Sequence, residues 1–292
     1  MTYDSLRLAC DFINMLFIMD EISDVQDGAG ARLTMDKHIT ILLGGQCDGS
    51  AISRMTSSIR TRILNLFGPN SLPRFLSEYR SYSEAIGVEA ARRDSRTVIS
   101  LEDYRIFRRE NGAVKPCLVF IEPCFGIDLP DKVFEDPIFK RLRDVALDMI
   151  LWSNDVYSYK MEQAKPGHSY SNYITVVMKE KGLTIQEAFD YAGTEFQTLM
   201  SQFIAEKAAL PSFGTEIDND LKCYVVGLER WVSGNLQFSF ETLRYFGGER
   251  EEVKKTLIVR LLRPADSNAS TPSHAVGKGC TESIRTLLSS KL

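Results

Sequence analysis

The sequence predicts an all-α protein built as one helical domain, and three observations favour this fold class. Apolar residues recur in long helical stretches, whereas segments with the alternation typical of strands are few. Helix-start signals also recur: Asp136 precedes Pro137, and Thr184 lies three residues before Glu187. No internal repeat or linker divides residues 1–263, so a single domain is the economical interpretation.

The predicted helices follow one another along the chain. The first is long and apolar, covers residues 4–26 and ends at a turn formed by Asp27 and Gly28. Further helices are expected over residues 35–44, 51–66, 73–92, 100–108, 116–125, 137–163, 185–208 and 216–246. The short VVM run at 176–178 has strand-like residues but lies in a helical context. Residues 264–292 are rich in Ser, Thr, Pro and Gly, and we expect them to form a mobile tail.

Composition narrows the class of partner. The 292 residues are 44% hydrophobic and 25% charged, as in an ordinary globular protein. A net charge of −4 with scattered basic residues argues against a nucleic-acid partner. The apolar run at 12–19, FINMLFIM, is too short to cross a membrane, and no signal peptide is visible. We therefore expect neither a nucleic-acid partner nor a membrane span.

The cysteines and histidines carry no recognisable metal site. The six cysteines form no CxxC pair, which indicates reduced thiols and a cytoplasmic protein. The three histidines, His38, His168 and His274, are far apart and lack zinc-ligand spacing. We expect all three to be structural or surface residues.

An unusual polar stripe lies in the segment LWSNDVYSYKMEQ. Asn154, Ser158 and Glu162 are spaced four and four residues apart, so a helix places their oxygens on one face. The preceding run VALDMILW is apolar, so this helix is expected to be buried and the oxygens to point inward. Three oxygen ligands at this spacing can hold a hard cation such as Mg2+.

A second acidic cluster lies in FIMDEISD. Asp20 and Asp24 are one helical turn apart, with Glu21 beside them. Taken alone, the cluster is more simply a solvated helix end, because charges are common there. Together with the Asn154 stripe, it predicts two helices that hold several Mg2+ ions between them, an arrangement suited to a diphosphate.

Basic residues at helix ends can complete a phosphate site. Arg108 and Arg109 precede the break Glu110-Asn111-Gly112, and Arg244-Tyr245 precedes a glycine pair. Arginine makes bidentate contacts to phosphate, and tyrosine can donate one more hydrogen bond. An arginine pair is usually a surface feature, and its position at a helix break is what favours a functional role.

The motifs DEISD, NDVYSYKME and RYFG, in this order, resemble those of the class I terpene synthases. The resemblance is closest to fungal sesquiterpene synthases of basidiomycete type and runs over residues 4–263. It implies a helical barrel that binds farnesyl diphosphate with three Mg2+ ions, as a monomer or homodimer. It implies one metal site at Asp20 and Asp24, and a second at Asn154, Ser158 and Glu162.

The resemblance also implies the diphosphate-binding residues. Arg108 lies 46 residues before Asn154, where the family carries its diphosphate-sensing arginine. Asn111 and Gly112 then link this sensor to a helix break whose movement helps to trigger ionisation. Arg244 and Tyr245 match a pair that hydrogen-bonds the diphosphate. Asp20, Arg108, Asn154, Arg244 and Tyr245 are therefore the expected catalytic residues.

Four departures from the family pattern stand out. Met161 replaces a basic residue that is frequent before Glu162, and Lys160, expected to bind diphosphate, lies one residue earlier, about 100° around the helix. Leu243 stands where many members have Glu, and Phe238 where Trp is frequent. Relatives begin with about two helices before the acidic motif, so this chain is expected to lack the first helices and to expose apolar surface.

The implied reaction is ionisation of farnesyl diphosphate followed by carbocation cyclisation to a sesquiterpene, with release of diphosphate. Aromatic faces can stabilise such a cation, and the candidates are Phe17 and Phe238, with Phe120 and Trp152 as further possibilities. For each of these residues, ordinary core packing is an equal alternative. By resemblance, a 1,11 ring closure is favoured over 1,10 or 1,6 closure.

Three rival interpretations remain open. A chain-elongating prenyltransferase requires a second Asp-rich motif, and none follows residue 150. A truncated or inactive synthase could bind isoprenoid diphosphate without turnover, as Met161 and the short N-terminal region allow. A helical scaffold without a site leaves two inward polar clusters unexplained.

Overall fold

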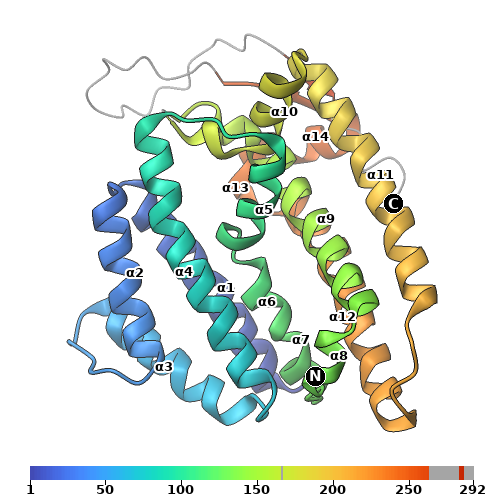
Figure 1. The fold of residues 1–292 in the computed structure, drawn as a ribbon. Coiled ribbons are helices and arrows are strands. Elements are labelled where there is room, and N and C mark those ends of the chain that lie inside the picture. The colour runs from blue at the N-terminus through green and yellow to red at the C-terminus, as the bar shows by residue number, and fades with distance from the viewer. Residues whose placement is uncertain (166, 263–282, 286–292) are drawn as a thin grey trace.

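The computed structural model describes residues 1–165, 167–262 and 283–285, and helices make up nearly all of its regular structure (Figure 1). The all-α fold class is confirmed. Five long helices run lengthwise through the molecule: α1 (Tyr3–Asp24), α4 (Ser71–Ser95), α9 (Pro137–Glu162), α11 (Ile185–Ala209) and α12 (Thr215–Glu241). Helix α9 packs against both α11 and α12, and α4 packs against α2 (Gly28–Leu42).

Shorter elements join these helices. They are α3 (Ala51–Leu66), α5 (Leu101–Asn111), α6 (Val114–Val119), α7 (Ile121–Phe125), α8 (Asp131–Glu135), the 3-10 helix η1 (His168–Ser171), α10 (Tyr173–Lys181), α13 (Leu243–Phe246), the 3-10 helix η2 (Gly247–Glu249) and α14 (Arg250–Thr256). The VVM run lies within α10, as its helical context indicated.

Capping side chains fix several helix starts that the sequence predicted. Asp136 accepts hydrogen bonds from the backbone N–H groups of Ile138 and Phe139 at 2.9 Å, with Pro137 in the first turn of α9. Thr184 and Glu187 form a reciprocal capping box at the start of α11. Both motifs satisfy N–H groups that have no partner inside the helix, so local sequence determines where α9 and α11 begin.

The prediction for residues 35–44 was wrong at its start, because α2 begins at Gly28. Asp27 was assigned to a turn that ends the first helix. In the structure its Oδ1 accepts the backbone N–H of Gly30 at 2.7 Å and caps the next helix. An Asp-Gly pair is compatible with a turn and also with a helix N-terminus. Here it begins a helix, α2, which packs against α4.

Other helix boundaries also differ from the prediction, and the helix expected over 73–92 runs from Ser71 to Ser95. The helix expected over 100–108 continues to Asn111, and the one expected over 116–125 is divided at Phe120 into α6 and α7. The helix expected over 216–246 ends at Glu241, because Thr242 adopts an extended backbone and caps α13 with its side chain. This last break places Arg244 and Tyr245 on a separate short helix.

The sequence did not predict the only sheet in the described part of the chain. Strand β1 (Ile258–Arg260) pairs antiparallel with β2 (Ser283–Arg285). Strand β2 falls within the tail expected to be mobile. The rest of that prediction, residues 264–282 and 286–292, lies outside the described residues.

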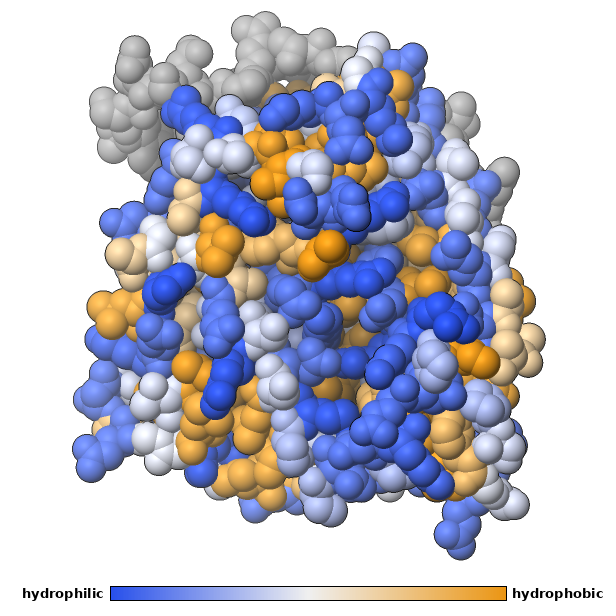
Figure 2. Space-filling view, in the orientation of Figure 1, coloured by the Kyte–Doolittle hydropathy of each residue, from blue (hydrophilic) through white to orange (hydrophobic). Residues whose placement is uncertain are grey.

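Two hydrophobic clusters form the core. One gathers around α9, α10, α11 and α12, and the other around α1 to α4 and α6. The half-buried Trp231 of α12 packs against both clusters. The face seen in Figure 2 is largely hydrophilic, with separate hydrophobic patches. Among the described helices, none combines the length and the apolar character needed to span a membrane.

Candidate active site

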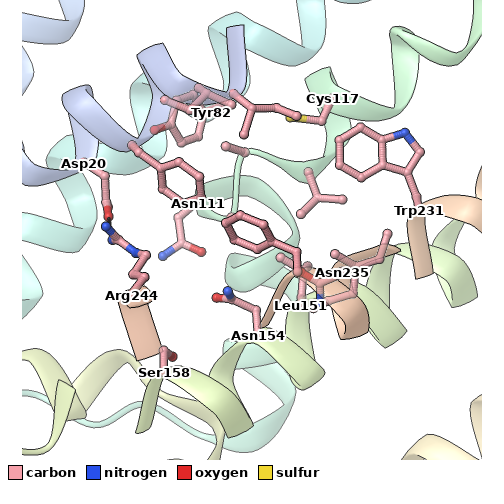
Figure 3. A pocket seen from close by; sticks show the side chains of 18 of the residues that line it. Asp20, Tyr82, Asn111, Cys117, Leu151, Asn154, Ser158, Trp231, Asn235 and Arg244 are labelled. Carbon is pink, nitrogen blue, oxygen red and sulfur yellow. Dashed lines mark hydrogen bonds and ion pairs between the residues drawn. The ribbon is translucent and has the colours of Figure 1, made fainter. Parts of the chain in front are cut away.

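A cavity of about 570 Å³ lies between the two halves of the core. Helices α1, α4, α5, α9 and α12 contribute to its wall, together with the α5–α6 break and α13. Charged and amide side chains lie near the ends of α1 and α9, whereas apolar and aromatic side chains line much of the remaining wall. Figure 3 shows Asp20, Asn111, Asn154 and Arg244 directed toward one another across this space.

Asp20 and Asp24 both line the cavity from the last turns of α1. Asp20 Oδ2 accepts a hydrogen bond from Arg244 Nη2 at 2.9 Å, and Arg244 Nη1 donates to Glu21 Oε1 at 2.9 Å. Glu21 is exposed and lies outside the cavity lining. Arg244 therefore joins the end of α1 to the segment that follows α12.

Three basic side chains surround Asp24. Arg93 of α4 approaches its carboxylate at 3.5 Å, Lys165 at 3.4 Å and His168 at 3.6 Å. Lys165 and His168 come from the segment after α9, and both line the cavity. These partners could not be predicted from the sequence, because they reach Asp24 only through the tertiary fold.

The polar stripe of α9 faces the same cavity. Asn154 Nδ2 donates to Tyr245 Oη at 2.9 Å, and Asn154 Oδ1 accepts from Arg108 Nη2 at 3.0 Å. Ser158 and Glu162 follow on the same face, and both line the cavity. The helical spacing thus brings all three oxygen-bearing side chains to one wall, opposite α1.

Two further residues fix this stripe, and sequence analysis missed both. Asp155 is 1% exposed, and its Oδ1 accepts from Arg108 Nη2 at 2.7 Å and from Nε at 2.9 Å. Asn172 Nδ2 donates to Glu162 Oε2 at 2.9 Å and to the Asp155 carbonyl at 2.8 Å. Asp155 adjoins Asn154 in sequence and could have been found as an acid within a buried helix.

The break between α5 and α6 lies against α9. Asn111 ends α5, Gly112 follows, and Ala113 adopts a left-handed backbone with φ of 57°. A Cβ on Gly112 would lie 2.1 Å from Leu151 Cδ2, so only glycine fits here without movement. Both Asn111 and Gly112 line the cavity, and Arg108 Nη1 donates to Asn111 Oδ1 at 3.4 Å. The arginine and the break are therefore in direct contact.

Lys160 does not reach the cavity. It forms an ion pair with Glu249 of η2 and is absent from the lining, whereas Met161 lines the cavity. The reason is rotation: one residue along α9 turns the side chain by about 100°. The structure therefore gives no support to Lys160 as a diphosphate ligand.

The four candidate aromatic residues divide into two groups. Phe17, Phe120 and Phe238 line the cavity, and the Phe17 and Phe238 rings stack with centroids 6.0 Å apart. The Arg244 guanidinium carbon lies 4.8 Å from the Phe17 ring centroid. Trp152 lies outside the lining and stacks on Tyr173 at 5.0 Å, so core packing is the correct description of it.

Burial changes the acidity of the cavity carboxyls. Although 45% of the Asp20 side chain is accessible, its enclosure by protein and the nearby Asp24 charge raise its pKa to about 6. Burial, with the nearby Asp155 charge, raises the pKa of Glu162 to about 7. Burial also raises the pKa of Glu89, a cavity residue of α4 that sequence analysis missed, to about 7. Each of these acids would gain from a neighbouring cation.

The donor set suits a hard divalent cation. Carboxylate, amide and hydroxyl oxygens from α1 and α9 are the ligands that Mg2+ prefers, and the cavity offers no cluster of sulfur or imidazole ligands in the described residues. No three His, Cys, Asp or Glu side chains of the described chain converge on a single point. The two ligand sets lie on different helices, α1 and α9, which both line the cavity.

Comparison with known proteins identifies the family of the chain. Residues 11–202 match the family described as terpene synthase family 2, C-terminal metal binding. Sesquiterpene synthase Agr1 of Cyclocybe aegerita is 37% identical over 262 residues, which cover 89% of this chain and 75% of that protein. A Coprinopsis cinerea protein named linoleate 10R-lipoxygenase COP4 is 42% identical over 264 residues, covering 90% of this chain and 76% of that protein.

A solved structure supports the same assignment at the level of the fold. Germacradien-4-ol synthase from Streptomyces citricolor superposes with a TM-score of 0.72 at 23% identity, covering 82% of this chain and 80% of that one. The family match spans more than half of the sequence and includes the parts of α1 and α9 that carry the oxygen ligands. The chain therefore belongs to terpene synthase family 2 and is a class I terpene synthase of the fungal type.

Proposed function

We propose that this terpene synthase is a Mg2+-dependent sesquiterpene synthase that ionises farnesyl diphosphate and cyclises the resulting carbocation. One observation carries the proposal: two sets of oxygen ligands, on α1 and α9, face each other across an otherwise largely apolar cavity, with Arg108 and Arg244 beside them. A diphosphate requires this combination of metal ligands and guanidinium groups, and an isoprenoid chain requires the apolar wall.

The metal ligands in this proposal are Asp20 and Asp24 on one side, and Asn154, Ser158 and Glu162 on the other. Bound Mg2+, proposed as three ions, would neutralise the diphosphate and make it a better leaving group. The raised pKa values of Asp20, about 6, and Glu162, about 7, belong to the metal-free site. A cation favours the ionised carboxylate, so ion binding and deprotonation support each other.

The arginines would stabilise the departing diphosphate. Arg244 forms an ion pair with Asp20, and Arg108 contacts Asp155 and Asn154. Burial lowers the pKa of Arg108, but the Asp155 carboxylate and other nearby acidic groups raise it by more, so the guanidinium stays charged and Asp155 orients it. Tyr245 is held by Asn154 at 2.9 Å and can donate its hydroxyl hydrogen to a phosphate oxygen.

The cavity wall would govern the carbocation. Phe17, Phe120 and Phe238 present aromatic faces or edges to the space, and a ring face attracts a nearby cation. Apolar residues elsewhere in the lining favour exclusion of water, which would otherwise quench the cation. The choice of a C15 substrate is supported by similarity to relatives named as sesquiterpene synthases, and 1,11 closure is our proposed cyclisation mode.

The proposal is tested by incubating the purified protein with farnesyl diphosphate and Mg2+. Release of diphosphate is measured by a coupled phosphate assay, and volatile products are identified by gas chromatography and mass spectrometry. We expect a cyclic C15 product that disappears when EDTA is added. If a folded preparation releases no diphosphate and forms no product, the proposal is refuted.

One observation favours a second candidate function, in which the protein binds the diphosphate without turnover. Met161 lines the cavity where a basic residue is frequent in the family, and Lys160 is paired elsewhere. A chain that binds the diphosphate without ionising it would show Mg2+-dependent binding in calorimetry but no diphosphate release. That result would favour the binding function over catalysis.

A further inference from the structure

Asn235 of α12 is a polar side chain in the cavity wall that none of the metal or diphosphate sites uses. It lies one helical turn from Phe238 and one from Trp231, and both of these aromatic residues line the cavity. Figure 3 shows Asn235 and Leu151 of α9 among the residues that line the pocket. A polar group among such neighbours is costly unless its hydrogen bonds are satisfied.

The amide nitrogen of Asn235 is fully engaged with α9. Its Nδ2 donates to Ser153 Oγ at 2.9 Å and to the Ile150 carbonyl at 3.3 Å. Ser153 Oγ in turn donates to the Met149 carbonyl at 2.7 Å, so toward Asn235 it acts as an acceptor. Both partners of Asn235 on α9 therefore require a donor, which fixes the orientation of the amide.

This orientation determines where the carbonyl points. With the NH2 group committed to α9, Oδ1 is turned away from Ser153 and toward the cavity that Asn235 lines. No described donor is bonded to Oδ1. The cavity wall therefore carries a fixed acceptor oxygen with a partial negative charge.

The depth of Asn235 separates it from the diphosphate site. It lies six residues before Glu241, the end of α12, which corresponds to about 9 Å along the helix. Arg244 and Tyr245 lie beyond that end, on α13. A substrate with its diphosphate at Arg244 would place the middle of its hydrocarbon chain, rather than its leaving group, near Asn235.

We propose that Asn235 determines product specificity: its Oδ1 attracts positive charge in the middle of the isoprenoid chain and so selects between competing carbocations. This inference rests on the proposed cyclase function. The oxygen is held in place before reaction, so it needs no reorganisation when the cation forms. Ser153 is the positioning residue, because it helps to hold the amide in this orientation.

The test compares product profiles of the full chain with farnesyl diphosphate and Mg2+. Asn235→Leu replaces the amide by an apolar side chain of similar size, and we expect the ratio of its two main products to change about tenfold, the effect of one contact that distinguishes two transition states. Diphosphate release should stay within about threefold of wild type, because ionisation occurs at the other end of the substrate. Gln237→Leu, on the exposed face of the same helix, is the matched control and should leave the profile unchanged.

Ser153→Ala is a second test of the inference, and it leaves Asn235 itself unchanged. It removes one acceptor that holds the amide, and it should shift the profile in the same direction by a smaller factor. Unchanged product ratios in both folded variants would overturn the inference. Loss of one oxygenated product with constant hydrocarbon ratios would show that Asn235 holds a water, and would also overturn the direct role. Failure of the wild-type protein to release diphosphate would instead refute the proposed function.

Discussion

Arg244 Nη2 donates to Asp20 Oδ2 at 2.9 Å, although the two residues are 224 positions apart in sequence. The contact brings a predicted diphosphate-binding cation onto a predicted metal ligand. The two groups form an ion pair at one side of the cavity. A bound metal-diphosphate complex would offer each of them a stronger partner of opposite charge. Binding of the substrate would therefore compete with the Arg244–Asp20 ion pair.

Arg244→Met should therefore reduce activity far more than stability. The Arg244 and Asp20 side chains are 22% and 45% exposed, and a solvent-screened pair of this kind contributes less than about 1 kcal/mol. Loss of a charge that stabilises the departing diphosphate lowers turnover by roughly 10²- to 10³-fold. Steady-state diphosphate release and thermal unfolding measure the two effects. If the loss of turnover were accompanied by an equally large loss of stability, a role of Arg244 in catalysis would be contradicted.

Asp20→Asn should abolish Mg2+-dependent turnover without weakening the metal-free fold. Enclosure by protein and the Asp24 charge raise the pKa of Asp20 to about 6 in spite of its ion pair with Arg244, so its ionised form is less favourable in the folded protein than in the unfolded chain. Removing that charge keeps or slightly raises the melting temperature in EDTA. Turnover should fall at least about a hundredfold, because a metal ligand is lost. Asn154→Ala should produce a comparable loss of turnover, and full activity in both variants would refute the metal assignment.

Gly112→Ala should destabilise the break between α5 and α6. The new methyl group would lie 2.1 Å from Leu151 Cδ2, and overpacking of this kind costs about 1–3 kcal/mol. Leu151→Ala supplies the matched test, because it removes the clashing atoms. In urea unfolding, the double variant should lose less unfolding free energy than the two single variants lose together. Additive losses would show that this contact does not constrain the break.

The sequence was informative wherever function follows helical periodicity. Asn154, Ser158 and Glu162 were predicted to share a face, and they do, because α9 is regular throughout. The same periodicity explains why the Lys160 side chain points to Glu249 and not into the cavity. Contacts made by distant segments could not be predicted in this way. Asn172 reaches Glu162 only because η1 and α10 fold back onto α9.

That support of Glu162 by Asn172 leads to a prediction about metal affinity. Asn172→Asp keeps an oxygen to accept the Ile174 N–H, now at 2.9 Å, and so preserves the cap of α10. It loses the amide donor to Glu162 and adds a like charge. Loss of such a supporting contact costs about 10- to 100-fold in metal affinity. The Mg2+ concentration for half-maximal diphosphate release should rise accordingly, and an unchanged Mg2+ dependence would contradict this role.

His38 should make the fold sensitive to acid through a group remote from the cavity. It is fully buried, its Nδ1 lies 2.6 Å from Thr56 Oγ1, and its Nε2 has no hydrogen-bond partner. Burial lowers its pKa from 6.5 to about 4, so the unfolded chain binds a proton more readily than the folded one. Stability from the neutral ring is therefore complete above pH 6.5 and declines as the pH falls toward 4, by up to about 3 kcal/mol.

Carboxyls with raised pKa values act in the opposite direction, so wild type is compared with His38→Gln in urea unfolding at each pH. Their difference in unfolding free energy should shrink from pH 7 to pH 4.5, and a constant difference would show that His38 does not titrate on unfolding.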